Sequence, residues 1–131
     1  METRVIVLGI IKNKNKYLIA KRASSKKFAP NKWEFISGFV DTGETAEDII
    51  LRELKEELKI NGIIKKSGSP YIVKDEYGRW ITIPYLIEVS NYSFTINKKD
   101  HSEVIWVGLK DLEKYKDLKM DVLEIKRGKL I

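Results

Sequence analysis

Three glutamates lie within five positions of the segment RELKEE, residues 52–57. If this segment is helical, Glu53, Glu56 and Glu57 crowd onto one face, because residues three and four apart are neighbours on a helix. Like charges at that spacing destabilise an isolated helix by about 0.2–0.5 kcal/mol per pair. Two explanations are open in a chain of net charge +6. The segment is either a solvated acidic face that tolerates the repulsion or a cluster that binds a cation.

The available residue types restrict which cation could bind. The chain has no cysteine, and His101 is its single histidine, which excludes disulfides, thiolate sites, cysteine nucleophiles and histidine-rich metal sites. A bound metal would have oxygen ligands, which Mg²⁺ and Mn²⁺ prefer. Without a cation, two carboxylates about 6 Å apart at an effective dielectric near 20 repel by about 3 kcal/mol. When no metal is bound, we therefore expect either that one glutamate stays protonated or that the cluster opens to water.

The charge is unevenly distributed along the chain. Residues 44–57 hold six acids and two bases, a net charge of −4, and because the whole chain carries +6, the remaining residues carry +10. An acidic segment in a basic protein suits a metal site beside a polyanionic substrate. Charge alone still favours the simpler interpretation, which is a set of solvated charges in a lysine- and glutamate-rich protein.

Helical periodicity places the three glutamates beside the apolar face. At 100° per residue, one side of a helix over 45–59 collects the large apolar residues, namely Ile50, Leu51, Leu54 and Leu58. The glutamates fall on the adjacent sector, with Ala46 and Ile49, rather than on the most exposed one. This position weakens the interpretation as a solvated face.

The acidic segment also belongs to a longer pattern. It reads Gly38, five residues, Glu44, seven residues, Arg52-Glu53-Leu54, one residue, Glu56-Glu57, one residue, Lys59 and Ile60. This pattern resembles the Nudix box, the signature of the Nudix hydrolase family, strongly over 33–60 and loosely over most of the chain. Lys59 stands where the family has a glycine, so we expect the helix to end slightly later, at Asn61-Gly62. Ser37 also stands where many relatives have glycine.

The resemblance implies an α/β fold, the Nudix α/β/α sandwich with a central mixed β-sheet, built by residues 1–131 as a single domain. It implies a metal site for Mg²⁺, with Mn²⁺ as the alternative. The metal would be held by the Gly38 backbone and by the carboxylates of Glu53, Glu56 and Glu57.

The resemblance also implies roles for neighbouring residues. Arg52 would orient Glu53, which would act as a ligand or as an acid–base group, and Glu44 would support the loop and the start of the helix. A further catalytic carboxylate is expected before the late tryptophan strand. Asp100 and Glu103 are both candidates, with a slight preference for Glu103, and His101 is expected to be a loop histidine.

Candidate substrate-binding residues lie near the expected substrate side of such a fold. They are Lys21, Arg22, Phe28, Trp33 and Phe35. Lysine and arginine could meet phosphates, and the aromatic rings could stack on a base, although core packing is the more common role for Trp33 and Phe35. The tripeptide Trp33-Glu34-Phe35 resembles the subgroup that acts on oxidised nucleoside triphosphates.

The remaining pattern predicts the elements that position these residues. Strands are expected over 4–12 and 16–22, joined as a hairpin, and over 33–36, 71–74, 80–89 and 103–107. Loops are expected over 23–32 and 37–43, helices over 45–59 and 109–118, and a helical start near 120. Pro84 argues for an edge or a bulge within 80–89, and 94–96 is ambiguous.

These observations predict a metal-dependent pyrophosphohydrolase that cleaves a nucleoside diphosphate linked to another moiety, either a nucleoside triphosphate or a nucleotide sugar or dinucleotide. The alternatives are a non-catalytic Nudix-fold module that binds a nucleotide or RNA, and a basic nucleic-acid-binding domain. No apolar run approaches the roughly 20 residues of a membrane span, and the N-terminus lacks signal-peptide features. We therefore expect a cytoplasmic protein with a small-molecule nucleotide substrate, no membrane and no stable nucleic-acid complex. A homodimer is left open.

Overall fold

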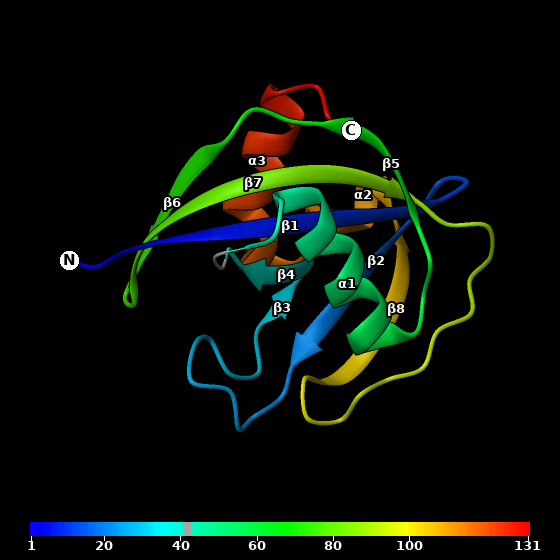
Figure 1. The fold of residues 1–131 in the computed structure, drawn as a ribbon, viewed down its shortest axis with the longest axis horizontal. Coiled ribbons are helices and arrows are strands. Elements are labelled where there is room, and N and C mark those ends of the chain that lie inside the picture. The colour runs from blue at the N-terminus through cyan, green and yellow to red at the C-terminus, as the bar shows by residue number, and fades with distance from the viewer. Residues whose placement is uncertain (41–42) are drawn as a thin grey trace.

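The computed structural model describes residues 1–40 and 43–131, which form an eight-stranded mixed sheet and its covering helices (Figure 1). The strands are β1 (Thr3–Asn13), β2 (Lys16–Arg22), β3 (Trp33–Glu34), β4 (Ile36–Phe39), β5 (Ile63–Ser67), β6 (Tyr71–Asp75), β7 (Gly78–Glu88) and β8 (His101–Gly108). The helices are α1 (Ala46–Leu58), α2 (Leu109–Leu112) and α3 (Lys119–Arg127), with a 3-10 turn, η1 (Lys116–Leu118).

Strand β1 is where the sheet divides. One edge of β1 pairs in parallel with β7 along most of its length. Its other edge is shared, because β4 pairs with it near Gly9 whereas β2 pairs with it only at the hairpin end. Strand β2 then pairs with β8 and β3. The short strands β3 and β4 thus belong to different halves of the sheet, and Phe35 alone separates them.

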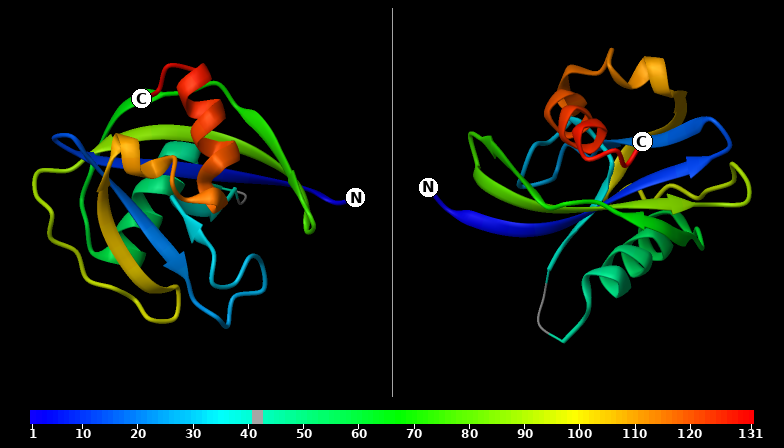
Figure 2. Two further views of the ribbon diagram at one scale, coloured as in Figure 1. Left: turned by 180° about the vertical axis from the view of Figure 1, so that it is seen from behind. Right: turned by 90° about the horizontal axis from the view of Figure 1, so that it is seen from above.

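Helices cover both faces of the sheet (Figure 2, right). Successive residues of a strand point to opposite faces, so Val7 and Ile11 of β1 share a core with the buried face of α1. Leu8 and Ile10 share the second core with Val122 and other residues of α3. The predicted α/β/α sandwich with a mixed central sheet is confirmed. None of the helices in the described part of the chain is long and apolar enough to cross a membrane.

Helix α1 begins and ends close to the predicted residues. The Thr45 hydroxyl caps it by accepting from the backbone N–H of Asp48 at 3.1 Å, as expected for an N-cap threonine. The helix ends at Lys59, whose φ of 59° is left-handed and whose N–H donates to the Lys55 carbonyl. The prediction that Asn61-Gly62 ends the helix is therefore wrong. Lysine itself takes the left-handed conformation that glycine usually supplies.

Gly62 has a different role, which is set by packing. A Cβ atom at this position would lie 2.4 Å from Cγ2 of Ile87 on β7, far inside van der Waals contact. The chain leaving α1 can therefore approach the sheet only because residue 62 has no side chain.

Pro84 lies in an internal strand, so the prediction of an edge is wrong. Strand β7 pairs with β1 on one side and with β5 and β6 on the other. Pro84 falls where β5 has ended and β6 has not begun, and its carbonyl accepts from the N–H of Gly68 at 2.9 Å. The missing N–H of proline is tolerated because the neighbouring ladder is interrupted there.

Three other segments differ from the sequence-based expectation. Residues 37–39 of the predicted loop 37–43 belong to β4 (Ile36–Phe39), and residues 41–42 of that loop lie outside the described residues. Strand β5 was not predicted at all. The predicted helix over 109–118 is interrupted into α2 and η1. Residues 94–96 form no strand.

Candidate active site

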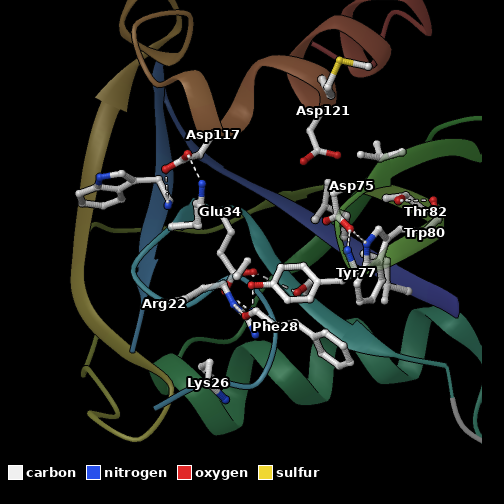
Figure 3. Close-up of a pocket in the computed structure, with 18 of the residues that line it drawn as sticks. Arg22, Lys26, Phe28, Glu34, Asp75, Tyr77, Trp80, Thr82, Asp117 and Asp121 are labelled. Atoms are coloured by element: carbon white, nitrogen blue, oxygen red, sulfur yellow. Dashed lines mark hydrogen bonds and ion pairs between the residues drawn. The ribbon is translucent and has the colours of Figure 1, made fainter. Parts of the chain in front are cut away.

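A pocket of about 700 Å³ lies between α1 and α3 and collects residues from both halves of the sheet (Figure 3). One side of its lining carries carboxylates, namely Glu34, Glu53, Glu57 and Asp100, together with Gly38. Another side is aromatic and consists of Phe28, Phe39, Tyr77 and Trp80. The pocket thus combines a strongly acidic surface with a surface that can stack a planar ring.

Gly38 allows α1 to lie against β4. A Cβ atom on Gly38 would lie 2.7 Å from Cγ of Glu53 and 3.3 Å from Cγ2 of Ile49. Any side chain at residue 38 would therefore push Glu53 away from the strand. The first glycine of the sequence pattern thus fixes the separation between a backbone segment and a carboxylate that both line the pocket.

Arg52 holds three of the four glutamates of the sequence pattern. It donates twice to Glu44, at 3.0 Å from Nε and 2.8 Å from Nη2, and Nη1 lies 3.3 Å from Glu53 and from Glu56. The structure places Arg52 beside Glu53, as expected, and shows that Glu44 is its main partner. The hydrogen bond from Arg52 lowers the pKa of Glu44, and the same bond raises the pKa of Arg52 further above its ordinary range.

Glu57 is held in a different environment from Glu56. Its Oε2 atom is buried and has no hydrogen-bond partner in the described part of the chain. Burial, and to a smaller extent the negative charges of Glu34, Glu53 and Asp100, raise the pKa of Glu57 to about 9. Burial also raises the pKa of Glu53. At neutral pH and without a cation, Glu57 is therefore protonated, which matches the expectation that one carboxylate of the cluster stays neutral.

The donor set fits a hard divalent cation. All of the acidic groups offer oxygen atoms, and the buried Oε2 of Glu57 lacks the partner that a buried polar atom needs. In the described residues, no three acidic or histidine side chains are already gathered at coordinating distance. Arg52 and Lys26 instead hold several of these carboxylates. Arg52 contacts Oε1 of Glu53 but both carboxylate oxygens of Glu56. Metal binding would therefore use the other oxygen of Glu53 and would require Glu56 to exchange Arg52 for the metal.

The structure separates the two candidates for a further carboxylate. Asp100 lines the pocket, lies 2.8 Å from Nζ of Lys26, and its charge raises the pKa of Glu57. Glu103 is absent from the pocket lining, is 57% exposed, and pairs with Lys21 at 4.0 Å. The geometry thus favours Asp100 as the further carboxylate, whereas the sequence slightly favoured Glu103. Lys21, a predicted substrate-binding residue, also lies outside the pocket lining.

Of the other predicted substrate-binding residues, some line the pocket and one does not. Arg22, Phe28 and Trp33 line the pocket. Phe35 is fully buried in the second core and does not reach the pocket, so its inclusion is corrected. The tripeptide Trp33-Glu34-Phe35 spans the end of β3, and Phe35 points into the core while its neighbours line the pocket.

The aromatic surface is organised around Phe28. Its ring makes edge contacts with Trp80 and Tyr77, at centroid distances of 5.2 and 5.7 Å. The guanidinium of Arg4 lies 4.6 Å from the Phe28 centroid and 5.1 Å from that of Trp80, and it donates to the Tyr77 carbonyl. Asp75 accepts from the Trp80 indole at 2.9 Å. These contacts hold the rings in fixed orientations before any ligand binds.

Several pocket residues were not identified from the sequence. Glu34 accepts from Arg22 and lies 2.8 Å from Nε2 of His101, which is buried at the start of β8 rather than in a loop. Three aspartates line the far part of the pocket, namely Asp75, Asp117 and Asp121. Burial raises the pKa of Asp121 to about 6, and Tyr71 donates to it at 2.7 Å. No local sequence signal distinguishes these acids, because their positions depend on contacts between distant segments.

Comparisons with known proteins agree with this geometry. A family model described as the NUDIX domain matches residues 2–126. The chain is 32% identical over 127 residues to the nucleoside triphosphatase NudI of Klebsiella pneumoniae subsp. pneumoniae, covering 88% of this chain and 89% of that protein.

Solved structures share the fold at lower identity. The MutT protein from Methanosarcina mazei Go1 has a TM-score of 0.86 at 18% identity, covering 98% of this chain and 94% of that one. An Ap4A hydrolase from C. elegans has a TM-score of 0.78 at 18% identity, covering 97% and 96% of the two chains. At these identities the likeness concerns the fold.

Proposed function

The chain belongs to the Nudix hydrolase family, which acts on pyrophosphate bonds, and from this premise we propose that it is a metal-dependent pyrophosphohydrolase of nucleoside triphosphates. The observation that carries this proposal is one pocket lining that contains two carboxylates of the Nudix box, Glu53 and Glu57, together with the aromatic surface around Phe28. A nucleotide has the same two parts, a polyanion and a planar ring.

The carboxylate side would hold Mg²⁺, or Mn²⁺ in its place, through Glu53, Glu56 and Glu57. When bound, such a cation would supply charge neutralisation at the phosphate oxygens and a lower pKa for the attacking water. Because the pKa values of Glu53 and Glu57 are raised, cation binding at these carboxyls would release protons. The Gly38 backbone lies against Glu53 and is a further candidate ligand.

The other residues of the site would orient the reacting groups. Arg52, itself clamped by Glu44, fixes the direction of Glu53. Asp100 would hold a proton of the attacking water or help to hold the metal, and Arg22 and Lys26 would bind phosphate oxygens. The base would stack against the Phe28 and Trp80 surface. Water then adds to phosphorus as the bridging P–O bond breaks, which gives a nucleoside monophosphate and pyrophosphate.

The choice of nucleoside triphosphates over other linked diphosphates is supported by the NudI relative, which is a nucleoside triphosphatase. The Ap4A hydrolase likeness supports a dinucleotide as the second candidate class, though only through the fold. We place the activity in the cytoplasm, where nucleoside triphosphates are made and used, as part of the same proposal.

A hydrolysis panel tests the proposal. Purified protein is incubated in Mg²⁺ and in Mn²⁺ with nucleoside triphosphates, oxidised dGTP, ADP-ribose, NADH and dinucleoside polyphosphates, and products are separated by chromatography. We expect a nucleoside monophosphate and pyrophosphate from a triphosphate, with no turnover in EDTA or in Glu57→Gln. Glu113→Gln serves as the matched control, because it changes an exposed glutamate that does not line the pocket. Tight binding of one compound without turnover of any would refute catalysis and support a binding module.

A further inference from the structure

Glu34 is the centre of a hydrogen-bond network that the Nudix box does not include. Its Oε1 accepts from Nη1 of Arg22 at 3.0 Å and from the Ser37 hydroxyl at 3.2 Å. Its Oε2 lies 3.1 Å from the same Arg22 nitrogen and 2.8 Å from Nε2 of His101. The side chains of Arg22 and Glu34 are only 18% and 16% exposed, so this ion pair is shielded from solvent.

Arg22 carries the network into the loop 23–32. Its Nε donates to the Phe28 carbonyl at 2.8 Å, and its backbone pairs with Lys32 and Asn31. The loop needs such contacts, because Ala29 and Asn31 have left-handed φ values of 46° and 63°. The left-handed region is unfavourable for a residue with a Cβ atom, and more so for alanine than for asparagine. The loop conformation that presents Phe28 to the pocket is therefore held by a side chain that Glu34 orients (Figure 3).

His101 carries the network in the other direction, to β8. Its side chain is buried, and the residue before it is Asp100. The backbone carbonyl of Asp100 accepts from Ala23 at 3.0 Å, and its carboxylate pairs with Lys26 of the same loop. Glu34 thus contacts one partner that positions Phe28 and another that is adjacent to Asp100.

We propose that Glu34 is a positioning residue that couples the two sides of the pocket, holding the Phe28 loop through Arg22 and the Asp100 segment through His101. The proposal rests on the proposed function for its catalytic consequence but not for its structural part. Glu34 contacts neither metal nor substrate in this role. It acts by keeping the Phe28 ring, which would stack on the base, and the Asp100 carboxylate, which lies near Glu57, in one relative arrangement.

Two variants break the network at different points. Glu34→Gln keeps the length of the side chain but removes the charge that holds Arg22. Arg22→Lys keeps a positive partner for Glu34, but its single nitrogen cannot serve both Glu34 and the Phe28 carbonyl. Glu113→Gln is the matched control, because Glu113 is exposed, pairs with Lys126 and does not line the pocket. Thermal melts first establish that each variant is folded.

Three measurements are made on each protein. The first is the rate of limited trypsin cleavage after Lys26 and Lys27 in the metal-free protein. The second is the Mn²⁺ affinity by calorimetry, and the third is kcat/KM for release of pyrophosphate from nucleoside triphosphates with Mg²⁺. We expect both network variants to be cleaved faster than the control. We also expect Mn²⁺ affinity and kcat/KM to fall by about 10–100-fold, the usual effect of losing a residue that orients ligands. The double variant should lose no more than the worse single variant, because both act on one unit.

The outcomes separate this proposal from the proposed function. If the wild type hydrolyses nothing, the proposed function fails, while trypsin cleavage and Mn²⁺ affinity still decide the role of Glu34. A folded Glu34→Gln protein that is cleaved at the wild-type rate overturns the proposal. So does a protein that is cleaved faster but keeps wild-type Mn²⁺ affinity and kcat/KM, because Glu34 would then be structural only. If Glu34→Gln does not fold, the same criteria apply to Arg22→Lys.

Discussion

Arg52 and Glu44 form a two-point contact across the first two turns of α1, with Nε and Nη2 of the arginine 3.0 and 2.8 Å from the two carboxylate oxygens. This contact leaves Nη1 directed at Glu53 and Glu56. Glu44 is eight residues before Arg52, which is too far for a simple helical neighbour. The spacing between Glu44 and Arg52 in the sequence pattern thus allows the orientation of the arginine to be fixed from outside the helix.

We predict that Glu44→Gln lowers kcat by about 10–100-fold, the usual effect of losing an outer ligand-orienting group. Arg52 would then be free to move fully onto Glu53 and Glu56 and to compete with the metal. The free energy of unfolding should change little, because exposed ion pairs contribute little to stability. Steady-state kinetics and urea denaturation measure the two effects. Unchanged kcat at saturating Mg²⁺ would show that Glu44 does not act through Arg52.

The stability of the metal-free protein should fall as pH rises. The pKa of Glu57 is about 9 in the folded protein, against an ordinary value of 4.5. A raised folded-state pKa means that the folded protein binds the proton more tightly than the unfolded chain does. The contribution of protonated Glu57 to the free energy of unfolding is therefore complete below pH 4.5 and is lost as pH rises toward 9. The raised pKa values of Glu53 and Asp121 act in the same direction.

Urea denaturation in EDTA across pH 5–9 measures this dependence, and the slope should be reduced in Glu57→Gln, which is neutral at every pH. Added Mg²⁺ or Mn²⁺ should stabilise the wild type more at high pH than at low pH, because the metal binds the deprotonated carboxylates. A stability that is flat from pH 5 to pH 9 in EDTA would contradict the protonated state of Glu57.

Lys59→Gly should stabilise the protein by about 1 kcal/mol, because it removes the cost of a lysine in the left-handed conformation. Part of that gain is offset by the greater freedom of glycine in the unfolded chain. Activity should be unchanged, since Lys59 does not line the pocket. Gly62→Ala is the contrasting variant and should destabilise, because its Cβ meets Ile87. Equal midpoints of urea denaturation for Lys59→Gly and wild type would mean that the left-handed cap carries no strain.

The sequence predicts α1 well because its evidence is local. The 3.6-residue period of Ile50, Leu54 and Leu58 and the cap residue Thr45 lie within one segment, and the structure has the helix within one residue of the expected ends. The sandwich fold followed from the resemblance carried by that same segment. Only the residues that terminate α1 were mispredicted: Asn61-Gly62 was expected to supply the stop, whereas Lys59 itself adopts the left-handed conformation.

The rest of the site depends on long-range register, which a single sequence does not contain. Phe35 and Glu34 are adjacent, yet one is buried in a core and the other lines the pocket. Asp121 approaches Tyr71 across fifty positions of sequence, and Glu34 approaches His101 across sixty-seven. Neither pairing leaves a local pattern. The sequence alone could not distinguish Asp100 from Glu103 for the same reason, since the position of the chain at the start of β8 decides which of the two side chains lines the pocket.

Asp100→Asn should lower kcat, whereas Glu103→Gln should leave it near the wild-type value. Asp100 lines the pocket and pairs with Lys26, but Glu103 is exposed and pairs only with Lys21 at 4.0 Å. Both changes remove one negative charge from neighbouring positions, so each controls for the other. A loss of about 10²-fold in kcat for Asp100→Asn matches the lower range for a group that assists proton transfer. The reverse order of effects would restore Glu103 as the catalytic candidate.

Phe28→Leu should raise KM for a nucleoside triphosphate with a smaller effect on kcat. Leucine keeps an apolar side chain beside Trp80 and Arg4 but removes the ring whose edge contacts organise the aromatic surface. Loss of one base–aromatic stack is expected to weaken binding by about 1–3 kcal/mol, which is roughly 5–150-fold in KM. Phe39→Leu changes a more exposed ring, 47% accessible, at the edge of the same surface and should have a smaller effect. If both variants keep the wild-type KM while Arg22→Lys does not, the base does not stack on this surface.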